Sequence, residues 1–157
     1  WLRTDSPRPP LMVGGGTGYA PLRAMLRQLV ATGDRRPVTL YWGARSAPDL
    51  YEHDRLLELE RERAGFAYCP VLSAPPSGDA APWAGRRGLV HEAALADRDD
   101  LSGFDVYASG PPAMIEAIRR DFLRHGLPRE QLFFDSFDYA PDTLAKLQGA
   151  AGSAPAQ

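Results

Sequence analysis

The sequence predicts an α/β domain: a five-stranded parallel sheet in the order 3-2-1-4-5, with helices on both faces. Three observations support this fold class. Short apolar runs alternate with longer amphipathic segments, which is the pattern of right-handed βαβ units. Glycines follow several of these runs, as expected where a buried strand turns sharply. The 157 residues, 44% of them hydrophobic and 24% charged, are enough for one domain with one core.

Each expected element rests on its own local pattern. The expected strands are apolar runs at 11–13, 38–42, 66–72, 105–109 and 132–134. The expected helices each carry an apolar stripe and cover 21–31, 50–63, 89–96 and 112–125. The inward stripe of the first helix is Leu22, Met25, Leu26, Leu29 and Val30. Phe133 and Phe134 are expected in the core, whereas His53, His91 and His125 are expected on helix surfaces without a catalytic role.

The two ends of the chain are expected to lie outside the domain. Residues 1–9, with their prolines, are interpreted as the remnant of an interdomain linker. The domain then covers 10–139, and 140–157 form a partly disordered tail. Residues 73–88 are expected to form an ordered loop around Trp83.

Composition argues against several classes of protein. The net charge of −2 gives no bulk attraction to nucleic acid. No apolar run reaches the roughly 20 residues of a membrane span. Cys69 is alone, which excludes an internal disulfide and a multi-cysteine metal site, and we expect no metal site at all. A reduced, cytoplasmic setting is expected.

A glycine-rich loop follows the first expected strand. Gly14, Gly15, Gly16, Thr17 and Gly18 let a ligand approach the backbone, and Pro21 suits the first turn of the following helix. Amides at a helix N-terminus favour a diphosphate. The pattern lacks the third glycine of G-x-G-x-x-G and the G-K-[ST] of a P-loop. The alternative is a tight turn that needs glycine for its geometry alone.

Two further strand ends carry candidate site residues. After the fourth expected strand come Ser109, Gly110, Pro111, Pro112, Ala113 and Met114, which should face the glycine-rich loop across the switch point of the sheet. After the second come Arg45, Asp49 and Tyr51. Arg45 could meet an adenosine phosphate and Asp49 a ribose. Alternatively, Arg45 is a surface residue and Asp49 a helix N-cap.

These three motifs, GGGTGYAP, GARSAPDLY and SGPPAM, resemble the nucleotide domain of the ferredoxin–NADP reductase family. The chain looks most similar to the reductase components of bacterial oxygenases, such as phenol hydroxylase reductase, and to flavohaemoglobin. The match runs from about residue 10 to residue 137. The resemblance implies that 10–139 form an NAD(P)-binding domain, joined in the family to an upstream FAD-binding barrel that is absent from this chain. The pair would pass hydride from NAD(P)H to FAD, and electrons onward to an iron–sulfur or haem acceptor such as a ferredoxin, an oxygenase or a haem protein.

The resemblance also implies roles for individual residues. The loop 14–18 and Pro21 would hold the diphosphate and nicotinamide side. Arg45 and Tyr51 match positions near the adenosine end. Gly110, Pro111, Pro112 and Met114 match the loop beside the nicotinamide. Phe137 matches an aromatic residue that covers the flavin ring, although it could also be the end of a core strand.

One departure concerns the reacting centre, because Ser109 stands where the family usually has cysteine. A serine keeps the size of the side chain but loses the soft sulfur contact. NADH is favoured over NADPH by the resemblance to oxygenase reductases, although Arg45 could serve a 2′-phosphate. Two other functions stay open: a non-enzymatic nucleotide-binding module and a stand-alone NAD(P)-dependent dehydrogenase.

Overall fold

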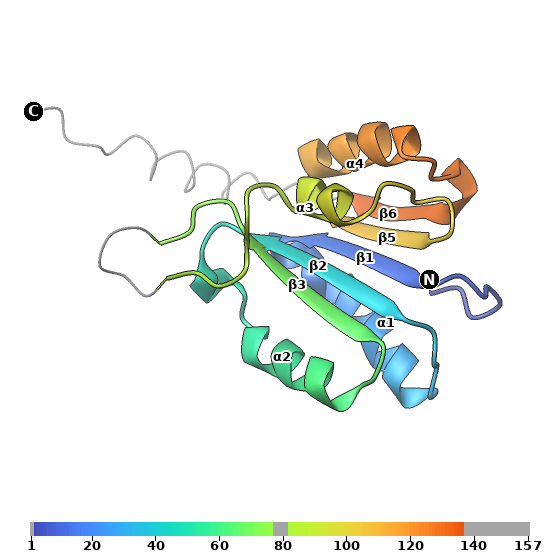
Figure 1. Cartoon of the computed structure of the whole chain (residues 1–157), viewed down its shortest axis with the longest axis horizontal. Helices are drawn as coiled ribbons and strands as arrows, with labels where there is room; N and C mark the ends of the chain where they lie inside the picture. Colours follow the sequence, from blue (N-terminus) through green and yellow to red (C-terminus); the bar gives the residue numbers. More distant parts are fainter. Residues whose placement is uncertain (1, 77–81, 137–157) are drawn as a thin grey trace, which may run out of the picture.

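An all-parallel sheet of six strands forms the centre of the computed structural model, which describes residues 2–76 and 82–136 (Figure 1). The strands stand in the order β4-β3-β2-β1-β5-β6. Their bounds are Pro10–Gly15 (β1), Val38–Ala44 (β2), Phe66–Leu72 (β3), Arg86–Arg87 (β4), Asp105–Gly110 (β5) and Leu132–Ser136 (β6). The predicted order of the five longer strands is confirmed. The predicted number is wrong, because β4 pairs with the end of β3 and two residues are too few to show a hydrophobic period.

In the described part of the chain, four α-helices cover the two faces of this sheet (Figure 1). They are α1 (Tyr19–Ala31), α2 (His53–Glu62), α3 (Val90–Asp97) and α4 (Pro112–Arg124), with short 3-10 turns at Gly16–Gly18, Ala47–Asp49 and Arg129–Gln131. Helices α1 and α2 pack on one face, and α3 and α4 pack on the other. α2 begins at His53 rather than at residue 50, because Ser46 and Asp49 first form a capping box around the 3-10 turn.

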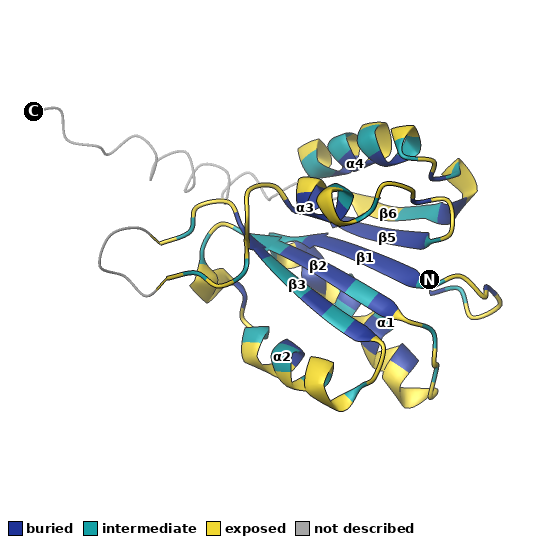
Figure 2. Cartoon of the chain, viewed as in Figure 1, coloured by how far each residue is buried: buried dark blue, intermediate teal, exposed yellow. Residues whose placement is uncertain are grey.

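The core has two halves, one on each face of the sheet. Alternate residues of a strand point to opposite faces, so Met12 packs with α1 and α2, while Leu11 and Val13 pack with α3 and α4. Figure 2 shows β1 and β5 buried along nearly their whole length. Burial on both faces explains why these strands are continuous apolar runs rather than alternating ones.

Three side chains differ in burial from the sequence prediction. Phe134 is 44% exposed because β6 is the edge strand, and Val30 is 48% exposed at the margin between α1 and α2. His91, expected on a helix surface, is only 5% exposed because α3 packs against α4. The periodicity of a helix shows which residues share a face, but not how far a neighbouring element covers that face.

The segment 2–9 is held against the amino end of the sheet. Leu2 is buried in the core half that contains α1, and the Arg36 guanidinium donates to the Ser6 carbonyl at 3.0 Å. Arg36 also pairs with Asp34 at 2.7 Å. Trp1, residues 77–81 and residues 137–157 lie outside the described ranges. Phe137 and the expected tail at 140–157 therefore lie outside the described residues.

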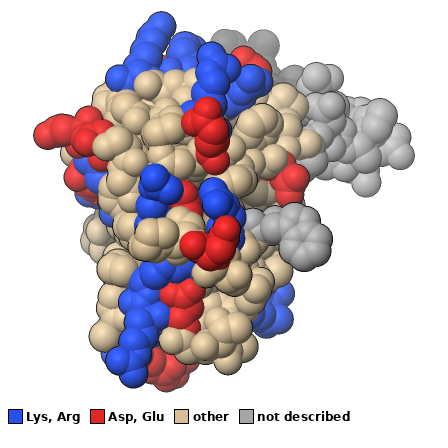
Figure 3. Space-filling view, turned by 90° about the vertical axis from the view of Figure 1, so that its right-hand side faces the viewer, with Lys and Arg blue, Asp and Glu red and all other residues tan. Residues whose placement is uncertain are grey.

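Charged side chains of both signs intermingle on the face seen in Figure 3, and they do not form one broad basic surface there. Arg120 with Asp121 and Arg36 with Asp34 are examples of arginines paired with a nearby carboxylate. Within residues 2–76 and 82–136, no helix has the length and apolar character needed to cross a bilayer.

Candidate functional site

The two glycine-containing loops meet at the centre of the sheet. β1 pairs with β2 on one side and with β5 on the other, so the switch point lies between β1 and β5 as predicted. Gly14 stands directly opposite Ser109 in the β1–β5 register. Both loops therefore leave the same carboxyl edge of the sheet, which is where ligands bind in open α/β folds.

Close packing explains why glycine is needed in these loops. A Cβ added to Gly18 would overlap the Ser109 carbonyl oxygen, and one added to Gly15 would overlap the Met114 sulfur. At Gly110 an added Cβ would lie 2.7 Å from Met114 Cε. Gly16 has φ of 56°, a conformation that other residues rarely adopt. The loops thus touch each other and leave no space for larger side chains.

A pocket of about 420 Å³ opens beside these loops, between the ends of β1 and β2 and the first turns of α3 and α4. Its lining residues are Gly15, Gly16, Gly43, Ala44, Arg45, Ser73, Gly88, Leu89, Val90, His91, Pro111, Ala113, Met114 and Ala117. We call it the α3–α4 pocket. Most of its wall is apolar, and its two ionisable side chains, Arg45 and His91, are both basic. Such a pocket is suited to part of a nucleotide.

Several residues that the sequence predicts for the site do not line this pocket. Thr17 is exposed in the turn that leads into α1, whose N-cap, Gly18, makes no side-chain capping hydrogen bond. The first amides of α1 therefore have no side-chain cap that competes with an anion. Asp49 accepts from the backbone N–H and hydroxyl of Ser46, so it serves as a cap of the 3-10 turn.

Tyr51 belongs to an aromatic cluster with Tyr19 and Trp42 rather than to the lining of the α3–α4 pocket. Tyr19 stacks on Trp42 with ring centroids 4.0 Å apart, and Tyr51 meets the Trp42 ring edge-on at 5.1 Å. The Trp42 indole N–H donates to the Gly16 carbonyl at 3.0 Å. This bond ties the glycine-rich loop to β2.

A smaller recess of about 90 Å³ lies on the other side of the loops, between α1, β5 and β6. Pro21, Ser109 and Phe134 are among its lining residues. Ser109 is 1% exposed, and its hydroxyl has no hydrogen-bond partner among the described residues, 2–76 and 82–136. A buried hydroxyl without a partner is costly, so this oxygen is a candidate contact for a bound group.

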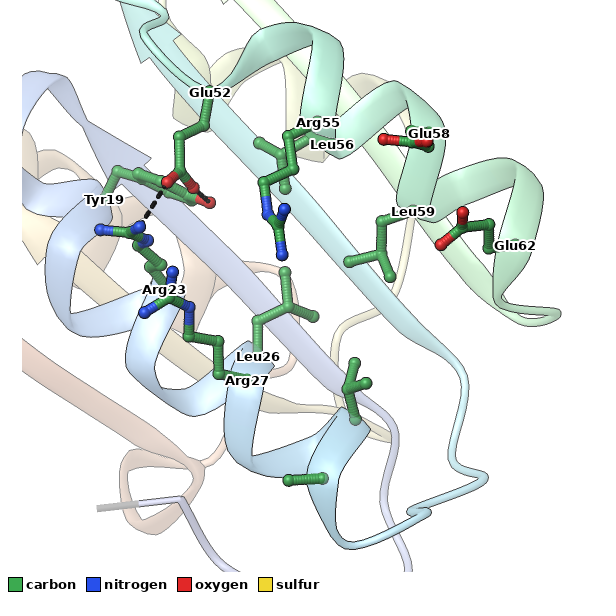
Figure 4. Close-up of a pocket in the computed structure, with 12 residues that line it drawn as sticks. Tyr19, Arg23, Leu26, Arg27, Glu52, Arg55, Leu56, Glu58, Leu59 and Glu62 are labelled. Atoms are coloured by element: carbon green, nitrogen blue, oxygen red, sulfur yellow. Dashed lines mark hydrogen bonds and ion pairs between the residues drawn. The ribbon is translucent and has the colours of Figure 1, made fainter.

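A third hollow, of about 440 Å³, lies between α1 and α2 and is drawn in Figure 4; we call it the α1–α2 groove. Glu52 accepts from the Tyr19 hydroxyl at 2.7 Å and pairs with Arg23 at 2.6 Å. Burial and the adjacent Glu52 carboxylate raise the pKa of Tyr19, so this hydroxyl keeps its proton. Tyr19, Arg23 and Glu52 therefore bind one another at this end of the groove, although the buried Arg23 Nε has no hydrogen-bond partner among residues 2–76 and 82–136.

The structure shows two contacts near the glycine-rich loop and the α3–α4 pocket that the sequence does not predict. The sequence predicts Trp42 only as a strand residue and His91 only as a helix-surface residue. No local signal distinguishes either role, because the partners Gly16 and Asp121 are 26 and 30 residues away in the chain. Among residues 2–76 and 82–136 there is no group of three or more His, Cys, Asp or Glu side chains that could hold a metal.

Known proteins provide an independent comparison. A family model described as the oxidoreductase NAD-binding domain matches residues 12–120. The chain is 41% identical over 137 residues to the CDP-6-deoxy-L-threo-D-glycero-4-hexulose-3-dehydrase reductase of Yersinia pestis, a match that covers 87% of this chain and 40% of that relative. It is 36% identical over 140 residues to a probable flavin reductase of Vibrio harveyi, covering 88% of this chain and 58% of the relative.

A solved structure agrees with these relatives. The crystal structure of the Amycolatopsis cytochrome P450 reductase GcoB is similar with a TM-score of 0.76 and 36% identity, over 85% of this chain and 39% of that chain. The chain therefore spans less than two thirds of the length of each of these proteins. The resemblance drawn from the three motifs is confirmed: the chain belongs to the oxidoreductase NAD-binding domain family of ferredoxin–NADP reductase-like proteins.

Proposed function

We propose that this chain binds NAD(P)H for a flavin-dependent reductase, in which hydride passes from the coenzyme to FAD and electrons continue to an iron–sulfur or haem acceptor. The observation that carries the proposal is the meeting of two glycine-containing loops at the β1–β5 switch point, with Gly14 opposite Ser109. The relatives named as reductases support the same reaction class. An FAD-binding barrel, and a ferredoxin, oxygenase or haem protein as acceptor, are the partners we propose.

The residues present fit a nicotinamide dinucleotide. Gly15, Gly18 and Gly110 pack tightly against Met114 and the Ser109 carbonyl, which fixes the shape of the two loops beside the α3–α4 pocket. Loop 14–18, Pro21 and the uncapped first turn of α1 would bind the diphosphate. The bound nicotinamide supplies the hydride, and the protein supplies position and electrostatics.

Ser109, Gly110 and Pro111 would orient the nicotinamide ring, with Pro112 starting α4 and Met114 packing over both loops. The Ser109 hydroxyl, which has no partner in the part of the chain that the structure describes, would hydrogen-bond a bound group in the recess that Pro21 and Phe134 also line. Phe137 remains our candidate for the aromatic cover of the flavin.

Arg45 and Tyr51 remain our candidates for the adenosine end of the coenzyme. Arg45 lines the α3–α4 pocket, and Tyr51 belongs to the aromatic cluster that supports the glycine-rich loop. We also propose a cytoplasmic setting, in which Cys69 stays reduced.

Calorimetry with NADH, NADPH and FAD tests the function. Binding of a pyridine coenzyme by this chain, with no oxidation of small substrates by the chain alone, supports the proposal. Oxidation of an alcohol or hydroxy acid by the chain without flavin would favour the stand-alone dehydrogenase. Failure to bind either coenzyme would remove the proposed function altogether.

We propose NADH as the preferred coenzyme. Within residues 2–76 and 82–136, the pocket is lined by one arginine, Arg45, and by no acidic side chain, so the charge of its wall excludes neither coenzyme, and the resemblance to oxygenase reductases favours NADH. Arg45→Ala should then weaken NADH and NADPH binding by about the same factor, because both share the diphosphate. A selective loss of NADPH affinity in titration calorimetry would assign Arg45 to the 2′-phosphate and overturn the preference.

A further inference from the structure

His91 is a buried ionisable residue that the proposed hydride transfer does not use. It is the second residue of α3, is 5% exposed and lines the α3–α4 pocket. Its Nε2 lies 3.4 Å from Asp121 Oδ2 on α4, and Figure 1 shows these two helices side by side on one face of the sheet. An ionisable ring at a pocket wall, paired with a carboxylate on the neighbouring helix, is an arrangement that responds to protonation.

Charged groups of both signs surround His91. Asp121 is the carboxylate that contacts it, and the pKa of Asp121 lies below its usual value, chiefly because Arg120 donates to it, with a contribution from His91. Asp121 is therefore ionised at neutral pH. Glu92 follows His91 on α3, while Arg124 lies near Asp121 and Arg45 lines the same pocket. The positive N-terminal end of the α3 dipole opposes the imidazolium, and Asp121 offsets it.

The lining of the pocket indicates the chemistry of the ligand group. Among the described residues, Arg45 and His91 are its ionisable side chains and no acidic side chain lines it, while Gly15 and Gly16 of the proposed diphosphate loop form part of its wall. A site with two basic groups attracts an anion. On the proposed function, which this inference presupposes, the nearest anion is the phosphate of the coenzyme.

We propose that His91, positioned by Asp121, contacts a phosphate group of the bound coenzyme in its protonated form and thereby makes coenzyme affinity depend on pH. The imidazolium attracts the phosphate, and the neutral ring does not. Affinity is therefore highest at low pH and falls as pH rises through the titration range of the imidazole. Asp121 acts through His91 and is a positioning residue.

ADP-ribose is the probe for this proposal, because its diphosphate is a diester and lacks the second ionisation, near pH 6, of a phosphate monoester. Calorimetry from about pH 5.5 to about pH 8.5 spans the ordinary titration range of histidine. The dissociation constant of the wild-type chain should rise about tenfold over this range, the size expected for one charge-assisted hydrogen bond. His91→Gln should abolish the rise, and adenosine, which carries no phosphate, should show none.

His125→Gln is the matched control, because His125 Nδ1 contacts the Asp121 carbonyl at 2.8 Å but does not line the pocket. This variant should keep the full pH dependence. Asp121→Asn should move the midpoint of the dependence to lower pH, which a merely structural link between α3 and α4 would not do.

Several results would overturn the proposal. The first is a wild-type dissociation constant for ADP-ribose that does not change with pH. The second is a His91→Gln variant whose dissociation constant changes with pH as much as that of the wild type. The third is an Asp121→Asn variant that loses thermal stability while the midpoint of its pH dependence stays where it is in the wild type. If His91→Gln does not fold, the Asp121→Asn midpoint decides. A chain that binds no ADP-ribose and no NADH at any pH rejects the proposed function itself, whereas tight but pH-independent binding rejects only the role of His91.

Discussion

Two hollows of similar volume, about 420 and 440 Å³, lie on opposite sides of the sheet and differ in how their polar groups are used. In the α1–α2 groove, Tyr19, Arg23 and Glu52 bind one another (Figure 4). In the α3–α4 pocket, Arg45 and His91 line a wall to which the described residues contribute no acidic side chain, and this wall adjoins the glycine-rich loop. Volume therefore does not distinguish a ligand site from a structural hollow. An excess of basic side chains beside the glycine-rich loop, at the carboxyl ends of the strands, does.

The largest effect is expected where the two loops touch. Gly18→Ala places a methyl group on the Ser109 carbonyl, and backbone cannot move aside as a flexible side chain can. We expect the free energy of unfolding to fall by about 3 kcal/mol and coenzyme binding to be lost. Urea denaturation and calorimetry measure both. Gly103→Ala is the control, since an added Cβ there meets nothing within 4 Å; equal behaviour of the two variants would contradict the tight contact.

A second variant tests whether the α1–α2 groove, unlike the α3–α4 pocket, has no part in coenzyme binding. Glu52→Ala removes the partner of Arg23 and leaves the buried Tyr19 hydroxyl unsatisfied, so the free energy of unfolding should fall by about 2 kcal/mol. The dissociation constant for NADH should stay unchanged, because the groove is structural. Glu58→Ala, at an exposed residue of the same groove, is the control for stability. A large loss of NADH affinity in Glu52→Ala would make the groove part of the site.

Trp42 connects the α1–α2 groove with the α3–α4 pocket, since it stacks on Tyr19 of the groove and its indole N–H donates to the carbonyl of Gly16, which lines the pocket. Trp42→Phe keeps an aromatic ring but loses the indole N–H, so stability should fall by about 1 kcal/mol and the glycine-rich loop should lose an anchor. NADH affinity is expected to fall severalfold. Tyr51→Phe, which keeps its ring contacts, should change neither quantity. Unchanged affinity in Trp42→Phe would show that the loop holds its shape without this bond.

The smallest effect on stability is expected at Ser109. Its hydroxyl has no hydrogen-bond partner among residues 2–76 and 82–136, so Ser109→Ala should leave the free energy of unfolding unchanged or raise it by up to about 1 kcal/mol. If the hydroxyl contacts the nicotinamide, NADH should bind about threefold more weakly while ADP-ribose, which lacks that ring, binds as before. Equal losses for the two ligands would place the hydroxyl elsewhere.

The fold and the position of the site could be predicted because they depend on local patterns. Continuous apolar runs in β1 and β5, buried on both faces, are readable as parallel strands. Gly14 to Gly18 and Gly110 follow two of these strands, and the switch-point rule then brings the loops together. Two-residue strands such as β4 and the exposure of Phe134 could not be predicted, because both depend on which element lies at the edge of the sheet.

By itself, the sequence determined the alternation of strands and helices, the glycine-rich turns and the family, because periodicity and backbone freedom are properties of neighbouring residues. Only the tertiary structure decided that His91 is buried against Asp121, that the Trp42 indole donates to Gly16, and that Glu52 accepts from Tyr19 across the α1–α2 groove. Each of these depends on two residues that are 26 or more positions apart in the chain. Their meeting is fixed by how helices pack on the two faces of the sheet, which no local pattern encodes.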